Sequence, residues 1–165
     1  EIHRGLPLSI APKVTEHDTV GENVFARQCI LRGIPILSAA LSNIFIPQSV
    51  NLDLVGGVSF QKGCYPGQEV VARVRYRGRP KQRMICAQVA TTETVPAGAE
   101  IECLDQSAGR NGTVVSAVAD SEPGLTVLLA SVPVAAMKNG GHEAFRIADE
   151  PLIIRPLPYS LSLEG

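Results

Sequence analysis

Tryptophan is absent from this 165-residue chain, and phenylalanine and tyrosine together supply only 4% of its residues. Large aromatic platforms for stacking nucleic-acid bases are therefore not expected. The net charge is −1 at pH 7, so the chain as a whole does not attract nucleic acid. Apolar runs stay short of the roughly 20 residues of a membrane span, and no cationic start followed by an apolar stretch marks a secretion signal. We therefore expect no membrane association.

Cysteine is sparse as well, with four widely spaced residues at Cys29, Cys64, Cys86 and Cys103. None belongs to a C-x-x-C pair, so we expect no zinc or iron–sulfur site built by this chain alone. A disulfide framework is also unexpected at this density, which indicates reduced thiols and a cytoplasmic location. Cys29, Cys86 and Cys103 fall in segments with apolar periodicity and are expected in the core.

A complete catalytic constellation is missing too. The three histidines, His3, His17 and His142, lie far apart, and no Ser/His/Asp or His/Cys arrangement of known spacing occurs. The sequence therefore leaves open whether the protein is an enzyme.

The first half of the chain predicts mixed helix and loop. Apolar spacing predicts a helix over 22–32 that stops at Gly33 and Pro35. Residues 58–60 are expected to form a short strand. Pro66 and Gly67 precede a second predicted helix: residues 68–77 are expected to be helical at their start, and Gly78 and Pro80 stop the helix.

The second half has a different pattern. Six short segments rich in Val, Ile and Leu alternate with turn signals; they are 83–90, 100–104, 112–119, 125–131, 143–148 and 152–155. This spacing predicts a small antiparallel barrel or sandwich. The fold class is therefore α+β, with one domain over 1–81 and a second, six-stranded β-barrel domain over 82–165.

Residues 62–69, Lys-Gly-Cys-Tyr-Pro-Gly-Gln-Glu, are the most informative part of the chain. Two glycines and a proline predict a tight turn that holds side chains outside the core. Lys62 and the amides of the following helix could each favour the thiolate of Cys64, which would make it nucleophilic. Alternatively, Cys64 is a buried packing residue and the glycines only mark a loop.

A run of cations follows this octapeptide: Arg73, Arg75, Arg77, Arg79, Lys81 and Arg83. If the run is extended, the cations share one face; if it is helical, they spread around the helix. The run is either a solvated linker or an anion site for a polyglutamate tail, an acidic protein or RNA phosphates. Few aromatic residues interleave with it, so sequence-specific reading of nucleic acid is not expected.

The octapeptide resembles the K-G-C-Y-x-G-Q-E hallmark of the YgfZ-type folate-binding proteins, relatives of the aminomethyltransferase (T-protein) of the glycine cleavage system. Further motifs are similar and occur in the same order: Gly33-Ile34-Pro35, Phe45-Ile46-Pro47-Gln48 followed by Asn51-Leu52, Arg77-Gly78 with the basic run to Arg83, and Pro156-Leu157-Pro158-Tyr159-Ser160-Leu161. The T-protein usually carries an acidic–aromatic pair where this chain has Cys64-Tyr65, so the YgfZ type is the better match. The chain also starts without methionine, and we expect that part of a longer protein precedes it.

The resemblance implies the C-terminal part of a GcvT-like (T-protein-like) fold and a tetrahydrofolate-binding auxiliary protein. Its implied role is to support assembly or repair of iron–sulfur enzymes, including tRNA-modifying ones. Folate and iron–sulfur proteins or assembly factors are the implied partners. Two alternatives stay open: a folate-dependent aminomethyl (one-carbon) transferase, and a module that binds RNA or protein through the barrel and the basic run.

The resemblance also implies a set of site residues. Cys64 is the expected functional thiol and Lys62 its supporting cation. The expected folate contacts are Gly63, Tyr65, Gly67, Gln68, Glu69 and Arg73. Several of these have simpler interpretations from the residues themselves. Lys62 can be a solvated surface lysine, Gly63 and Gly67 can serve the backbone conformation, and Tyr65 can be a half-buried ring with its hydroxyl at the surface. Gln68 and Glu69 can simply start the helix, and Glu69 can also brace the loop.

Overall fold

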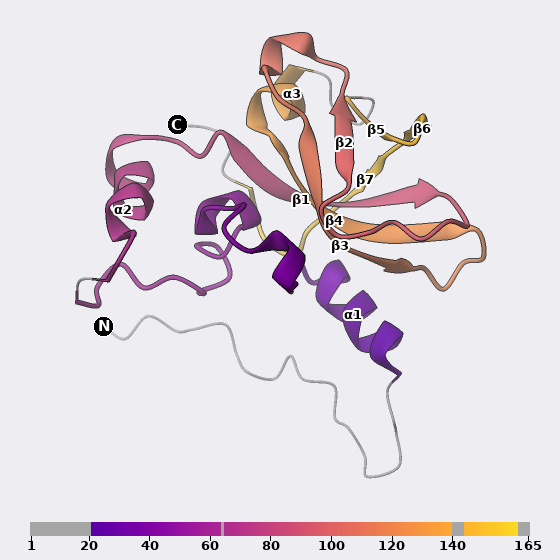
Figure 1. Ribbon diagram of the computed structural model, residues 1–165, viewed down its shortest axis with the longest axis horizontal. Helices are drawn as coiled ribbons and strands as arrows, with labels where there is room; N and C mark the ends of the chain where they lie inside the picture. Colours follow the sequence, from indigo (N-terminus) through magenta and orange to yellow (C-terminus); the bar gives the residue numbers. More distant parts are fainter. Residues whose placement is uncertain (1–20, 64, 140–143, 162–165) are drawn as a thin grey trace.

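The computed structural model describes residues 21–63, 65–139 and 144–161. A β-sheet lies on one side of the molecule, and the helices and loops of the first half lie against it and beside it (Figure 1). Cys64 and the three histidines fall outside the described residues.

The helices and strands follow this order: α1 Glu22–Leu31, η1 Ala39–Leu41, η2 Pro47–Val50, α2 Gln68–Arg77, β1 Gln82–Ala90, β2 Glu100–Cys103, η3 Gln106–Ala108, β3 Gly112–Ala119, β4 Leu125–Pro133, α3 Val134–Asn139, β5 Phe145–Ile147, β6 Glu150–Pro151 and β7 Ile153–Arg155.

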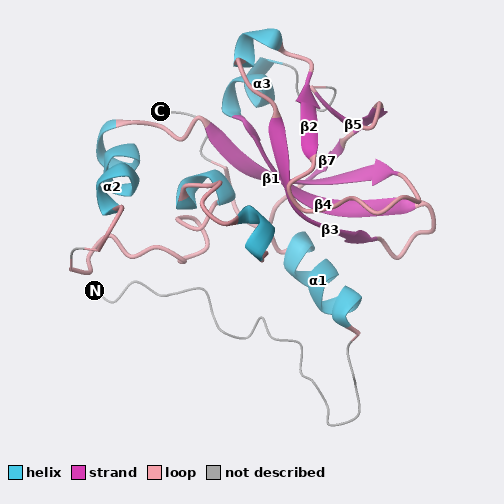
Figure 2. Cartoon of the chain, viewed as in Figure 1, coloured by secondary structure: helices cyan, strands magenta, loops and turns pink. Residues whose placement is uncertain are grey.

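The strands form one antiparallel sheet in the order β6-β5-β2-β3-β4-β1-β7, which curls into a nearly closed barrel (Figure 2). β6 pairs with β5 and β7 pairs with β1, so the short stretch 150–155 spans the gap between the two edges of the sheet. The backbone N–H of Leu152, between them, donates to the carbonyl of Phe145. The strand predicted over 152–155 is therefore confirmed as β7, whereas the two-residue strand β6 was not predicted, so the described residues form seven strands instead of six.

Both predicted helices are confirmed as α1 and α2. α1 ends in a Schellman motif, in which Gly33 N–H donates to Ile30 O and Ile34 N–H donates to Cys29 O. Gly33 has φ +64°, the left-handed conformation that this ending requires.

The strand predicted over 58–60 is wrong, since these residues are irregular. Three residues give too few ladder hydrogen bonds to form a strand unless a neighbouring strand pairs with them. Phe60 instead packs its ring against α2, where it meets Tyr76 edge-to-face at 6.4 Å between ring centroids.

β4 is buried on both faces, and this explains its continuous apolar sequence. Leu128, Ala130 and Val132 belong to the core inside the barrel. Val127 and Leu129 face a second core that also contains residues from α1, η1 and η2. The first half therefore covers the barrel from outside.

That second core joins the two halves of the chain: Ile30, Leu41 and Val50 pack with Met84 and Cys86 of β1. The domain boundary predicted near residue 81 lies in the link between α2 and β1, and as a division between domains it stays a prediction. Cys29 and Cys86 are buried as expected, and burial raises the pKa of the Cys86 thiol to about 11. Cys103 is only partly buried.

Three of the motifs that resemble the YgfZ type meet at this junction. Asn51 is fully buried and left-handed (φ 57°). Its side chain donates to Met84 O at 2.7 Å and accepts from Met84 N–H at 3.2 Å. Asn51 also donates to the Tyr159 hydroxyl, which donates to Gly33 O at 2.8 Å. One asparagine thus links β1, the C-terminal segment and the end of α1.

A second polar group surrounds Arg83 at the start of β1. Its guanidinium forms a double hydrogen bond with the Asp53 carboxylate, at 2.7 and 3.1 Å, with both side chains buried. It also donates to Gln48 O at 3.0 Å. The Gln48 side chain donates in turn to Val71 O at 2.8 Å, which ties α2 to η2. Buried charges are tolerated when they are paired in this way.

Candidate functional site

The octapeptide loop lies away from the barrel, at the start of α2 (Figure 1). A proline–glycine turn shapes its second half. Gln68 N–H donates to Tyr65 O at 3.2 Å across Pro66 and Gly67. Gly67 has φ 81° and ψ −3°, the values of the third residue of a type II turn. The sequence Tyr-Pro-Gly-Gln therefore folds locally, because proline and glycine suit the two central positions.

Gln68 also braces this turn with its side chain, whose Oε1 accepts a hydrogen bond from Tyr65 N–H at 3.2 Å. The side-chain oxygen of Gln68, a predicted folate contact, is thus already bonded within the loop. Glu69 is exposed in the first turn of α2, where a carboxylate suits the positive end of the helix dipole.

The two glycines of the octapeptide differ. Both are exposed, and a Cβ added at Gly63 or Gly67 would meet no described atom within 4 Å. The positive φ of Gly67 accounts for glycine there. For Gly63 neither backbone strain nor packing in the described part of the loop does so.

Lys62 and Tyr65 lie together on the two sides of residue 64. The Lys62 ammonium sits 4.5 Å from the centroid of the half-buried Tyr65 ring, a cation–π contact. This contact holds a positive charge within the loop. The distance from that charge to the Cys64 thiol lies outside the described structure, so the support that Lys62 gives to Cys64 stays a prediction.

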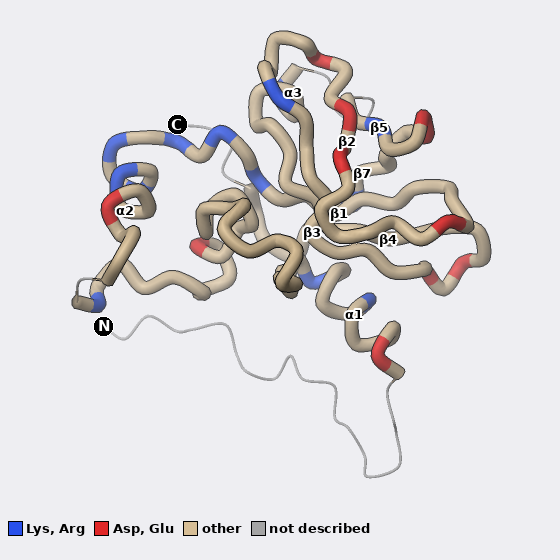
Figure 3. The backbone as a smooth tube through the Cα atoms, in the orientation of Figure 1, with Lys and Arg blue, Asp and Glu red and all other residues tan. Residues whose placement is uncertain are grey.

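Residues 60–81 form what we call the cationic arm. Arg73, Arg75, Arg77, Arg79 and Lys81 are all exposed, and Figure 3 shows positive residues gathered along α2 and the link that follows it. Because residues 73–77 are helical, their side chains spread around the helix instead of sharing one face.

Arg83 does not belong to this surface. The sequence run placed it at the end of a candidate anion site, but it is 6% exposed and paired with Asp53. An incoming anion would have to displace a buried carboxylate. The exposed site therefore ends at Lys81.

Aromatic residues lie on the arm in a way that the sequence analysis did not anticipate. The Arg75 guanidinium lies 5.2 Å from the centroid of the Phe60 ring. Tyr76, which meets the same ring, is 70% exposed. The helical spacing of Arg73 and Tyr76, three residues apart, is the signal that would have indicated a shared surface.

Asp120 is another residue that the sequence analysis missed. Its buried carboxylate accepts hydrogen bonds from Arg27 of α1, Arg155 of β7, Gln88 of β1 and the backbone of Ser121. Burial pushes the pKa of Asp120 up, but hydrogen bonds and attraction from Arg27 outweigh it, so the pKa lies below its usual value. Asp120 thus clamps α1 to the barrel.

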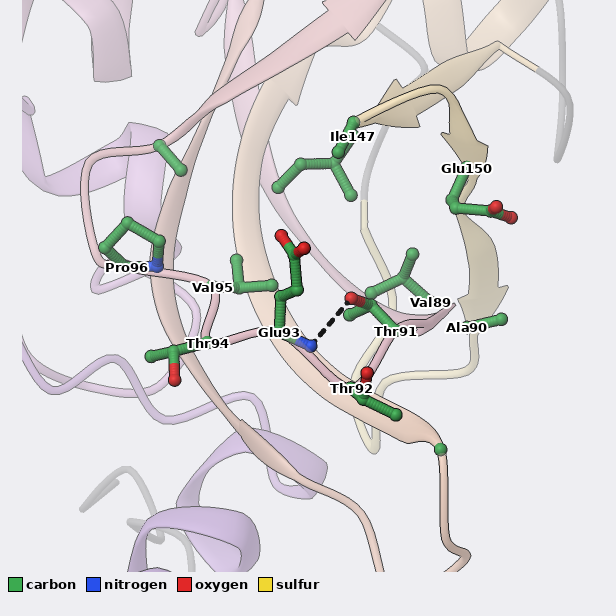
Figure 4. A pocket seen from close by; sticks show the side chains of 13 residues that line it. Val89, Ala90, Thr91, Thr92, Glu93, Thr94, Val95, Pro96, Ile147 and Glu150 are labelled. Atoms are coloured by element: carbon green, nitrogen blue, oxygen red, sulfur yellow. Dashed lines mark hydrogen bonds between the residues drawn. The ribbon is translucent and has the colours of Figure 1, made fainter.

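The barrel end far from the arm carries a cleft of about 670 Å³. The loop with Glu93 and Val95 faces the β5–β6 hairpin with Ile147 and Glu150 (Figure 4). The residues that line this cleft include two glutamates and no lysine or arginine. The cleft therefore suits neither the glutamate tail of a folate nor another anion. A neighbouring cleft of about 460 Å³ is lined by Glu93, Asp120 and Glu122, and its lining also contains no lysine or arginine.

Within the described ranges, no three His, Cys, Asp or Glu side chains gather closely enough to hold a metal ion. Every helix in that part of the chain is too short or too polar to cross a membrane.

Comparison with known proteins gives a consistent result. No family model matches the chain. The chain is 41% identical over 139 residues to the tRNA-modifying protein YgfZ of Photorhabdus laumondii, which covers 80% of this chain and 40% of that protein. It is 40% identical over 135 residues to the protein of the same name from Escherichia coli O157:H7, covering 78% of this chain and 39% of that protein. The chain thus spans about two fifths of the length of the curated relatives it matches. The resemblance first indicated by the octapeptide is confirmed, and over about four fifths of its length the chain is a relative of the YgfZ proteins.

Proposed function

We propose that this chain is part of a YgfZ-type protein that acts in tRNA modification by supporting iron–sulfur enzymes in a tetrahydrofolate-dependent way. The observation that carries the proposal is the octapeptide loop. Its described residues stand outside both cores in a chain about 40% identical to proteins named for tRNA modification. Cys64 is the proposed functional thiol.

The loop contains residues whose types are not explained by packing in the described cores. Lys62, Gly63 and Glu69 are exposed, so the described cores do not need these residue types. The tyrosine–proline–glycine turn and the Gln68 brace fix the backbone on the far side of residue 64. A fixed turn, a lysine two residues away in sequence and the amino end of α2 are the conditions that favour a reactive thiolate.

The described residues fit only part of a folate. The two acidic clefts of the barrel do not fit its anionic glutamate tail, because carboxylates line them. On the arm, Lys62 and Arg73 are exposed cations of the kind that hold the carboxylates of a glutamate tail. We therefore assign to this chain the anionic end of the cofactor. Tetrahydrofolate itself supplies one-carbon chemistry when bound.

The proposal is tested by replacing Cys64 with alanine in the chromosomal gene of the organism that encodes this chain. We expect the tRNA nucleosides that depend on iron–sulfur enzymes to fall to the level of a gene deletion, measured by mass spectrometry of digested tRNA. Cys103→Ala is the matched control, because Cys103 is a partly exposed thiol on the barrel. Wild-type nucleoside levels in the Cys64→Ala strain would remove Cys64 from the mechanism.

Folate dependence is tested separately by titrating tetrahydrofolate polyglutamate against the full-length protein. Arg73→Gln should weaken binding of the polyglutamate more than binding of the monoglutamate, because only the longer tail offers extra carboxylates. Equal affinities for both ligands in wild type and variant would exclude Arg73 from the folate site. Turnover of an aminomethyl donor by the same protein would favour the transferase alternative.

A further inference from the structure

The cationic arm combines a dense positive charge with an exposed ring. Its described cations are Lys62, Arg73, Arg75, Arg77, Arg79 and Lys81, all exposed. Glu69 is the one carboxylate in the arm's sequence. The acidic residues of the barrel end lie on the opposite side of the molecule (Figure 3). A chain with a net charge of −1 thus presents one strongly positive surface.

Tyr76 lies on α2 between Arg75 and Arg77. Its ring is 70% exposed, and its edge-to-face contact with Phe60 fixes the ring's orientation. Phe60 is itself held by the Arg75 guanidinium at 5.2 Å. On α2, Arg73 precedes Tyr76 by three residues, so its guanidinium group can reach the space around the ring, whereas Arg75 and Arg77 flank Tyr76 in sequence and lie on neighbouring sides of the helix.

An exposed aromatic ring flanked by arginines is the arrangement that binds unpaired nucleotides. The ring stacks on a base, and the arginines neutralise the adjoining phosphates. An acidic protein surface would use the cations but would gain little from the ring. An RNA duplex would offer phosphates, but its bases are already stacked on one another.

We propose that the cationic arm binds an unpaired segment of RNA, with Tyr76 stacked on a base and Arg73, Arg75 and Arg77 on phosphates. This inference rests on the proposed function, because it assigns the RNA partner of a protein that acts in tRNA modification. Recognition of this kind tolerates different sequences, because every base offers a face to stack on. It also anchors α2, and with it the octapeptide loop, against RNA.

The test measures fluorescence anisotropy of a labelled, unpaired RNA with the purified full-length protein between about 50 and about 200 mM salt. Replacing Arg73, Arg75 and Arg77 with glutamine should reduce the slope of log K against log salt by about 2, since each phosphate contact on single strands contributes about 0.7. The matched control replaces Arg110, Lys138 and Arg146, which are exposed cations of the barrel half, with glutamine. The control has the same net charge and should keep the wild-type slope.

The ring is tested with Tyr76→Ala, which should weaken binding of the unpaired RNA by about 5- to 150-fold. Tyr76→Phe keeps the ring and should stay within about twofold of wild type, which also controls for a disturbed arm. Binding of duplex RNA should be insensitive to both changes. An unaltered affinity of Tyr76→Ala for unpaired RNA would overturn the inference. So would an equal loss in the control triple variant.

The two proposals can fail independently. Cys64→Ala should bind the unpaired RNA like wild type, because the thiol takes no part in this contact. If the arm variants bind RNA normally while Cys64→Ala still abolishes the tRNA nucleosides, only the RNA inference is wrong. If the arm variants lose RNA while Cys64→Ala supports modification fully, the proposed function is wrong.

Discussion

Two groups of residues carry the resemblance to YgfZ proteins, and the structure uses them differently. Gly33, Gln48, Asn51 and Tyr159 meet in the junction between the first half of the chain and β1. The octapeptide stands apart from that junction at the start of α2, with most of its described residues exposed. The buried group is explained by folding. The exposed group is not, and this makes it the better candidate for function.

The largest effect is expected from breaking the buried ion pair. Asp53→Ala leaves Arg83 charged and without its carboxylate inside the protein. We expect the free energy of unfolding to fall by about 3–5 kcal/mol, measured by urea denaturation. Glu69→Ala removes an exposed carboxylate and should change it by less than about 0.5 kcal/mol. If both variants lowered the free energy of unfolding by similar amounts, the junction and the arm would not differ in their contribution to stability.

Gly33 of the junction and Gly63 of the octapeptide form a matched pair, for which we expect a smaller effect on stability. A Cβ at Gly33 would lie 2.5 Å from the Tyr159 Oη, and φ is +64°. Gly33→Ala should therefore lower the free energy of unfolding by about 1–3 kcal/mol. Gly63→Ala places its methyl group in open space and should leave stability unchanged within about 0.5 kcal/mol. Thermal denaturation of both variants checks this, and a destabilised Gly63→Ala would show that position 63 serves the fold.

Acid should release the Asp120 clamp. The pKa of Asp120 in the folded protein is lowered, so its stabilising contribution is full above the carboxyl pKa of the unfolded chain, about 3.9. That contribution is lost as the pH falls through the lower folded-state pKa. Asp120→Asn should lower the free energy of unfolding at pH 7 by about 1–3 kcal/mol. In acid, the difference in free energy of unfolding between the variant and wild type should become smaller. Urea midpoints across pH 3–7 test this; parallel curves would exclude Asp120 as the titrating group.

The smallest effect on stability is expected at Lys62. Lys62→Met removes a charge from an exposed position beside the Tyr65 ring. The free energy of unfolding should change by less than about 0.5 kcal/mol. Alkylation of Cys64 at neutral pH should become slower, because less thiolate is present. Cys86 is an internal reference in the same mass-spectrometric experiment: it is buried and its pKa is about 11, so it should stay unmodified. Unchanged alkylation of Cys64 would separate Lys62 from the thiol.

Local patterns in the sequence were sufficient for the elements. The helix ending at Gly33, the helix after Pro66-Gly67 and the strand segments all follow from glycine, proline and apolar spacing. The strand expected at 58–60 failed, because a strand also needs a partner that no local pattern specifies. The strand β6 was missed for a related reason: its two residues form a strand only because β5 pairs with them.

The candidate site was predictable in part. The octapeptide, its turn and its position before a helix could be identified from residue types alone. The run of cations gave no indication that Arg83 pairs with Asp53, thirty residues earlier, since the two become neighbours only when β1 packs against η2 and the turn after it. Neither the exposure of Tyr76 nor the acidic clefts could be anticipated, because both depend on which surfaces the two cores leave uncovered.

The sequence by itself determined the local conformations of this protein, because glycine, proline and side-chain periodicity act over a few residues. It also determined the resemblance to YgfZ proteins, because an eight-residue motif and about 40% identity are properties of the chain alone. Only the tertiary structure decided which motif residues are buried in hydrogen bonds and which stay exposed. Burial and pairing join residues that are far apart in the chain, as Asn51 and Tyr159 do across more than a hundred positions.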